Sequence, residues 1–207
     1  MNPDKVKLRI INRFVSAAQS HEKAEALLRC IIVELGYEED YFEVLFPAGL
    51  VDVLNSILSL RFYAFAEHLD KEDLCSMKVR ERIKFLLMGL FAELRDSKVA
   101  IRSILCGSIG DLRMFIANLK VSWEIVDEMW HLAGDESTDF NFYTKRILLF
   151  SVFVPSVIYW LKEDSDVALD KFVTQLLLRV NKLGKFKGFV QERMQSSLLC
   201  KVFARFF

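Results

Sequence analysis

The sequence predicts an all-α fold, and three observations lead to this prediction. Gly and Pro, which mark the tight turns of sheet proteins, number only 8 and 3 among 207 residues. Apolar residues make up 53% of the chain and recur at helical spacing over long segments. A chain of this length can bury a sizeable core, so we expect one large helical domain, with or without a small appendage.

Helix signals follow one another along the chain. The first helix is expected over residues 5–18, where Val6, Ile10 and Phe14 share one face. This segment is basic and amphipathic, as transit peptides are, but a first helix is the favoured interpretation. A second helix is expected over residues 22–35, before Gly36. Further helices are expected over residues 50–68, 77–95, 98–107, 111–120, 122–132, 143–161 and 166–183.

A short third helix follows the second, and three short N-terminal helices invite a helix-turn-helix interpretation. The third helix would then read DNA, yet residues 38–43 hold four acids and no base. DNA binding depends on neutralising phosphates with Lys and Arg. The sequence therefore predicts a degenerate helix-turn-helix that does not bind nucleic acid.

One apolar run, Ile147 to Leu161, raises the question of a membrane span. Its fifteen residues reach ~22 Å as a helix, short of a hydrocarbon core of about 30 Å. Pro155 also removes a backbone hydrogen bond inside the run. We expect a buried core helix here.

The charges are unevenly distributed, although the formal net charge is zero. Residues 182–207 hold six bases and one acid, which leaves a net charge of −5 on residues 1–181. The apolar residues of this basic tail fall on helical faces, so residues 185–207 resemble a segment that lies on a membrane surface. The alternative is a helix docked on the body or on a second subunit. The expected membrane-binding residues are Lys201, Phe203, Arg205, Phe206 and Phe207.

Side chains for catalysis or metal binding are scarce. The four cysteines lie far apart, and Cys30, Cys106 and Cys200 stand in apolar segments where a buried thiol is usual. Among three histidines, His131 has a carboxylate four residues earlier on the same helix face, Asp127, and an ion pair is a better interpretation than a metal site. No phosphate-binding glycine loop or nucleophile motif is present. We therefore expect no catalytic residue, no metal and no cofactor.

A polar segment in the second half of the chain, VDEMWHLAGDESTDFNFYTKR (Val126 to Arg146), interrupts the apolar helices. Gly134 is placed to end one helix, and Asp135, Ser137 and Asp139 are N-cap candidates for the next. The segment closely resembles the signature of the coenzyme Q (ubiquinone) biosynthesis accessory lipid-binding proteins, the ninth protein of that pathway. The matching residues are Asp127, Trp130, Ala133, Gly134, Asp135, Ser137, Thr138, Asp139, Phe140, Asn141, Tyr143, Thr144, Lys145 and Arg146.

The resemblance, which extends more weakly over residues 46–183, implies a fold and a set of partners. The implied fold is similar to tetracycline-repressor-type regulators. It has a degenerate helix-turn-helix over residues 1–46, a lipid-binding and dimerisation domain over 47–184 and a membrane-associating tail over 185–207. The implied function is binding of an isoprenoid quinone or its precursor and cooperation, without catalysis, with the di-iron demethoxyubiquinone hydroxylase. The implied location is the cytoplasmic face of a bacterial inner membrane, or the matrix side of the mitochondrial one.

Carried over to this sequence, the surface that contacts the hydroxylase comprises Asp127, Trp130 and His131. One departure is visible, because the family commonly has Trp-Pro-x-Ala where this chain has Ser97 to Ala100. The alternative function is a ligand-responsive transcriptional regulator. The residues expected to line the lipid pocket are Phe85, Met88, Phe91, Phe115, Phe150, Phe153 and Val154.

Overall fold

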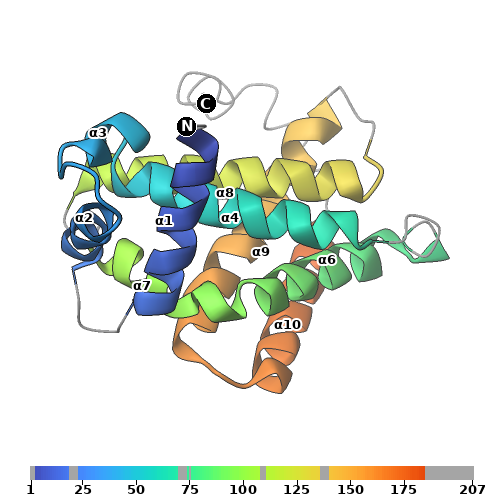
Figure 1. Cartoon of the computed structure of the whole chain (residues 1–207). Coiled ribbons are helices and arrows are strands. Elements are labelled where there is room, and N and C mark those ends of the chain that lie inside the picture. Colours follow the sequence, from blue (N-terminus) through green and yellow to red (C-terminus); the bar gives the residue numbers. More distant parts are fainter. Residues whose placement is uncertain are drawn as a thin grey trace. The chain divides into compact units, whose positions relative to one another are not determined.

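The computed structural model describes residues 3–18, 23–69, 74, 76–107, 111–135 and 140–184, and every regular element in these ranges is helical (Figure 1). The all-α prediction is confirmed. The expected tail residues Lys201, Phe203, Arg205, Phe206 and Phe207 lie outside the described residues. The elements are α1 (Pro3–Ala17), α2 (Ala24–Glu34), α3 (Tyr41–Leu45), α4 (Leu50–Glu67), α6 (Val79–Glu93), η1 (Arg95–Ser97), α7 (Lys98–Gly107), α8 (Leu112–Leu132), α9 (Phe140–Lys162) and α10 (Asp166–Gly184).

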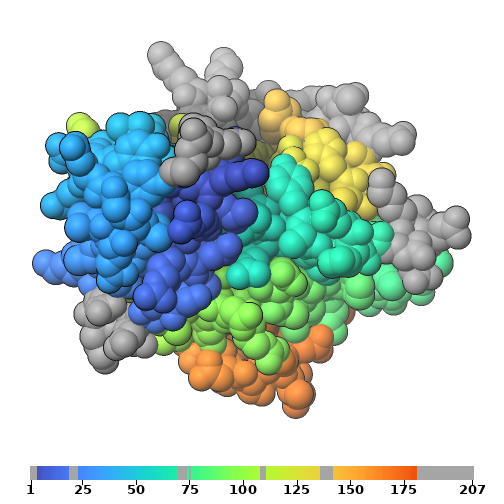
Figure 2. Space-filling view, viewed as in Figure 1, coloured from blue at the N-terminus to red at the C-terminus, as the bar shows by residue number. Residues whose placement is uncertain are grey.

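By compactness the chain divides into unit 1, residues 1–136, and unit 2, residues 137–207. The domain boundaries expected at residues 46 and 184 separate regions by their expected roles. The division by compactness does not test these roles, so the boundaries stay predictions. In unit 1, α4 packs against both α8 and α6, while α1 packs against α2, η1, α4 and α7. Figures 1 and 2 show α1 beside α4, with η1 and α7 at its lower end. Val6, Ile10 and Phe14 of α1 are buried, so this segment belongs to the core as a first helix should.

The expectation of two helices over residues 111–120 and 122–132 is wrong, because α8 is continuous from Leu112 to Leu132. No Gly or Pro interrupts it, and the Ser122 hydroxyl donates to the carbonyl of Asn118 within the helix, at 2.9 Å. At its start, the Asp111 carboxylate accepts from the amides of residues 113 and 114 at 2.8 and 3.2 Å. This N-cap fixes where α8 begins.

The cysteines are a second correction. Cys30 and Cys106 are exposed, whereas the apolar segments around them suggested buried thiols. In sequence, Cys30 lies between Leu28 and Ile31, and the side chains of Leu28 and Ile31 are buried in the core of unit 1. An apolar segment of a helix has an outward side, and Cys30 lies on it. Cys200 lies outside the described residues.

Arg29 of α2 binds the acidic segment of residues 38–43, in which α3 begins. Its guanidinium donates to Glu43 at 2.6 Å and to Glu25 at 2.8 Å, and lies 3.8 Å from a carboxylate oxygen of Glu39. The same group lies 4.8 Å from the ring centroid of Phe42. The hydrogen bond from Arg29 lowers the pKa of the Glu43 carboxyl. One base thus holds two helices together, although α3 and its approach remain acidic.

Unit 2 contains a pair of helices. The rings of Tyr159 in α9 and Phe172 in α10 stack with centroids 4.2 Å apart. The stretch from Phe142 to Lys162 is long and apolar enough to cross a membrane, a property that buried helices of soluble proteins share. Of the most apolar 18 residues in this stretch, 33% are buried. The helix α9 continues through Pro155.

The substitution Glu43→Gln tests the Arg29 contact through the pH dependence of stability. Because the pKa of Glu43 is lowered on folding, its contribution is present above the ordinary value of 4.5 and is lost as the pH falls through the folded value. Between about pH 5 and pH 3, the thermal midpoint of the parent protein should therefore fall more steeply than that of the variant. Glu38→Gln controls for the loss of one negative charge. Equal slopes for the parent and Glu43→Gln would contradict the assignment.

Candidate functional site

The signature segment contains a sharply defined helix end. Gly134, with φ +77°, follows Ala133 and takes the left-handed conformation. Its amide donates to the carbonyl of His131, and the amide of Asp135 donates to that of Trp130, both at 3.0 Å. This double hydrogen bond is the Schellman motif, so the predicted role of Gly134 is confirmed.

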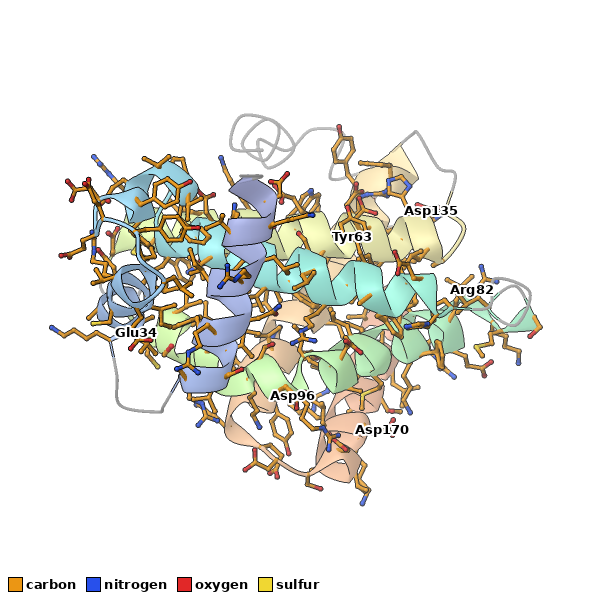
Figure 3. The ribbon with its side chains drawn as sticks, viewed as in Figure 1. Glu34, Tyr63, Arg82, Asp96, Asp135 and Asp170 are labelled. Carbon is orange, nitrogen blue, oxygen red and sulfur yellow. The ribbon has the colours of Figure 1, made fainter. Side chains whose placement is uncertain are left out.

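Arg82 of α6 binds the same helix end from a distance in sequence. One guanidinium nitrogen, Nη1, donates to the carbonyl of Ala133, and Nη2 donates to the carbonyl of Met77 at 3.2 Å. A positive group at the C-terminus of a helix is also favoured by the helix dipole. Figure 3 labels Arg82 and Asp135 at this end of unit 1. Arg82 therefore joins the start of α6 to the end of α8.

The three expected partner-binding residues lie on the last two turns of α8. His131 Nε2 and Asp127 Oδ2 are 3.4 Å apart, and their side chains are 55% and 32% exposed. Trp130 is half-buried, whereas the neighbouring residues Val126 and Met129 of the same helix are buried completely. The structure therefore brings Asp127, Trp130 and His131 together on one accessible surface. The contact between Asp127 and His131 has the geometry of the expected ion pair.

The rest of the signature lies in unit 2, at the start of α9. Arg146 is 1% exposed, and its guanidinium lies 3.3 Å from the ring centroid of Phe142 and donates to the carbonyl of that residue at 3.2 Å. Tyr143, by contrast, is 56% exposed. The signature thus holds one buried cation and one accessible phenol on adjacent turns. Ser137, Thr138 and Asp139 lie outside the described residues.

The expected lipid-binding residues fall in both units. In unit 1, Phe85 and Phe115 are exposed, Met88 is half-buried and Phe91 is buried. Phe115 is also about 27 Å along α8 from the helix end that Arg82 of α6 contacts, so these four do not form one cluster. In unit 2, α9 carries Phe150 and Val154, half-buried, and Phe153, buried. Their lipid contacts stay predictions.

The helices α4 and α6 approach each other closely near Phe85. The ring of Phe65 in α4 lies 6.4 Å from that of Phe85 in α6. It also lies directly over Gly89, where a Cβ atom would meet the Phe65 ring at 2.2 Å. Gly89 therefore lets an aromatic ring rest on the backbone of α6. The neighbouring Met88 is half-buried beside it.

Among the described residues, no three His, Cys, Asp or Glu side chains are grouped so that they could hold a metal ion. His131 and Asp127 supply two such side chains on an accessible helix turn. Two exposed ligands are fewer than a structural or catalytic metal site in a protein ordinarily uses. The contact between Asp127 and His131 therefore has the character of an ion pair on the helix surface.

Comparison with known proteins places the signature within a wider match. Residues 116–184, which include most of α8 and all of α9 and α10, match the model of the COQ9 family. The resemblance to the COQ9 family is confirmed. The human ubiquinone biosynthesis protein COQ9, mitochondrial, is 39% identical over 49 residues, which is 24% of this chain and 15% of the human protein. The rat protein of the same name is 40% identical over 48 residues, with 23% and 15% covered.

A longer COQ9 match covers nearly the whole chain. The probable ubiquinone biosynthesis protein coq9, mitochondrial, of Dictyostelium discoideum is 23% identical over 214 residues, which is 93% of this chain. The match covers 65% of the Dictyostelium protein. The chain therefore spans less than two thirds of the length of these COQ9 relatives.

Arg82 and Arg29 are the residues that sequence reasoning missed. Arg82 lies outside residues 116–184, the part of the chain that matches the COQ9 family model. Nothing in the sequence indicates that it contacts a carbonyl 51 residues away. Arg29 has Glu25 at i−4, a helical pair that can be read from the sequence, but Glu43 joins it only through the fold.

Replacing Arg82 by Ala should lower the free energy of unfolding by about 2 kcal/mol, because the charged hydrogen bond to Ala133 is lost. Arg80→Ala, at an exposed position of the same helix, should change it by less than about 0.5 kcal/mol. Hydrogen exchange at the amides of Gly134 and Asp135 should accelerate in Arg82→Ala only. Unchanged exchange there would show that Arg82 does not hold the end of α8.

Proposed function

We propose that this protein is a non-catalytic accessory protein of ubiquinone biosynthesis that binds isoprenoid lipids. It takes up a polyprenyl quinone intermediate at the membrane and presents the head group to the di-iron hydroxylase that acts on demethoxyubiquinone. The observation that carries this proposal is the accessible surface of Asp127, Trp130 and His131 inside a segment that matches the COQ9 family. The relatives named above are ubiquinone biosynthesis proteins.

The physical basis of the partner contact is the half-buried indole of Trp130. Large aromatic residues dominate many protein interfaces, because they bury much apolar area at a small cost in conformational entropy. Trp130 projects from the last turns of a helix whose end is fixed by Gly134 and Arg82. A rigid anchor of this kind needs little reorganisation on binding.

Transport of a polyprenyl lipid requires binding that is easily reversed. Burial of the polyprenyl chain in the protein is worth roughly 25 cal/mol per Å² of apolar area, and the membrane interior offers a similar gain. Exchange between protein and bilayer is therefore close to balanced. The location that we propose is the matrix side of the mitochondrial inner membrane in a eukaryote, or the cytoplasmic face of a bacterial inner membrane. The names of the relatives, which say mitochondrial, support the first of these.

A homodimer is part of the proposal. Unit 2 exposes large apolar side chains on both described helices: Ile158 is 52% exposed, Val167 64% and Leu178 42%. Exposed apolar surface of this kind is typical of subunit interfaces. A second copy of the chain would remove it from water.

Organic extraction of the purified protein, followed by mass spectrometry, tests lipid binding. We expect an isoprenoid quinone or its precursor in stoichiometric amount, because a protein that presents such lipids retains them against dilution. Phospholipid alone, at less than one molecule per chain, would contradict the proposal.

Trp130→Ala tests the partner surface. Loss of a central aromatic anchor should weaken binding to the purified hydroxylase by at least about thirtyfold, as measured by surface plasmon resonance. Leu112→Ala is a matched control, since Leu112 is 70% exposed at the other end of the same helix. Equal affinities for the two variants would remove Trp130 from the interface.

Ile158→Asp tests the dimer by sedimentation velocity. A charge at a buried interface is costly, so this variant should shift the protein from dimer to monomer at micromolar concentration. Val79→Asp, at a residue of unit 1 that is 54% exposed, should leave the dimer intact. A dimer that persists in Ile158→Asp would place the interface elsewhere.

A further inference from the structure

A row of bases runs along the exposed side of α1. Lys5, Arg9 and Arg13 follow one another at intervals of four residues, and all three are exposed. Successive members are therefore about 6 Å apart along the helix axis. Leu8 stands in the same exposed arc and is 41% exposed, although a leucine on a helix of the core is ordinarily buried.

α7, which packs against α1, continues this charge. Lys98 and Arg102 are one helical turn apart on the side of α7 that is not fully buried. Figure 2 shows the surface of α1 next to that of η1 and the start of α7. Together α1, η1 and α7, which we call the basic face, hold seven bases and two acids.

The basic face contrasts with the neighbouring surface. Residues 24–45, which form α2, α3 and the turn between them, hold six acids and one base, Arg29. A helix-turn-helix that binds DNA needs its bases on the third helix, and here they are on the first and the seventh. The four carboxylates of residues 38–43 would repel a DNA duplex that approached the basic face together with this neighbouring surface.

The bases of α1 are only weakly neutralised. Lys5 and Arg9 form no ion pair with any residue that the structure describes. Arg13 and Glu34 are 3.9 Å apart, but their side chains are 61% and 62% exposed, and such a surface pair contributes little to stability. Most of this charge is available to an external partner.

We propose that the basic face binds the anionic surface of a phospholipid bilayer, with Leu8 inserted between the head groups. A row of long cationic side chains around one exposed apolar residue suits a flat, laterally mobile anionic surface, because lipid head groups can rearrange to meet each base. This contact is separate from the tail of residues 185–207. The inference rests on the proposed function in one respect, namely that the protein works at a membrane.

Flotation of the full-length protein with vesicles tests this inference. The probes are vesicles of phosphatidylcholine alone and of phosphatidylcholine mixed with phosphatidylglycerol. Removing two bases by Lys5→Gln with Arg9→Gln should weaken binding to the anionic vesicles by roughly tenfold or more, and Leu8→Ser should weaken it further. All three positions are exposed, so circular dichroism should show an unchanged fold.

The matched control is Lys162→Gln with Lys171→Gln, which removes the same charge at exposed positions of unit 2. This control should change the affinity for anionic vesicles by less than about twofold. Equal binding by the two double variants, or tighter binding of duplex DNA than of anionic vesicles by the parent protein, would overturn the inference.

The lipid extracted from each variant separates the two proposals. Weaker vesicle binding with an unchanged isoprenoid lipid content supports both. Unchanged vesicle binding with isoprenoid lipid present overturns only the role of the basic face. If vesicle binding depends on Lys5 and Arg9 while no isoprenoid lipid is present, the proposed function fails and the membrane contact stands.

Discussion

The hydrogen bond from Arg82 to the carbonyl of Ala133 is the contact on which the candidate site depends. It joins two residues that are 51 positions apart in sequence, one in α6 and one at the end of α8, and it satisfies a carbonyl that the helix itself leaves without a partner. The left-handed Gly134 turns the chain away directly afterwards. Trp130 and His131, whose carbonyls accept the two closing hydrogen bonds, are fixed by the same arrangement.

Much of the fold follows from local signals in the sequence. α7 has the expected bounds, and the ends of α2 and α8 coincide with Gly36 and Gly134, both in the left-handed conformation. Where local reasoning failed, a long-range or context-dependent effect decided. The predicted break near residue 121 is absent because no Gly or Pro interrupts α8 there, and the Ser122 hydroxyl bonds to the Asn118 carbonyl within the helix. Burial of Cys30 could not be judged from apolar neighbours alone, because the side of the helix decides it.

The candidate site was also predictable in part, from the resemblance to a family signature rather than from local helix signals. The accessible surface of Asp127, Trp130 and His131 follows from a specific signature at fixed spacing. The support beneath it does not, because Arg82 donates to a backbone carbonyl, a group that every residue has, so no pattern of residue types reveals this contact. The lipid contacts are the least predictable part. With 18 Phe in the chain, the residue type does not separate a core ring such as Phe91 from an exposed one such as Phe115.

The unbroken course of α8 has a mechanical consequence. From the Asp111 cap to Leu132 the helix is a stiff rod of about 30 Å, without a Gly or Pro that could act as a hinge. A load applied by a partner at Trp130 cannot be absorbed by bending at that end alone. It would act also on Val121 and Ile125, which are buried residues of the same helix, and α8 packs against α4. Docking at Trp130 would thereby be transmitted to the interior of unit 1.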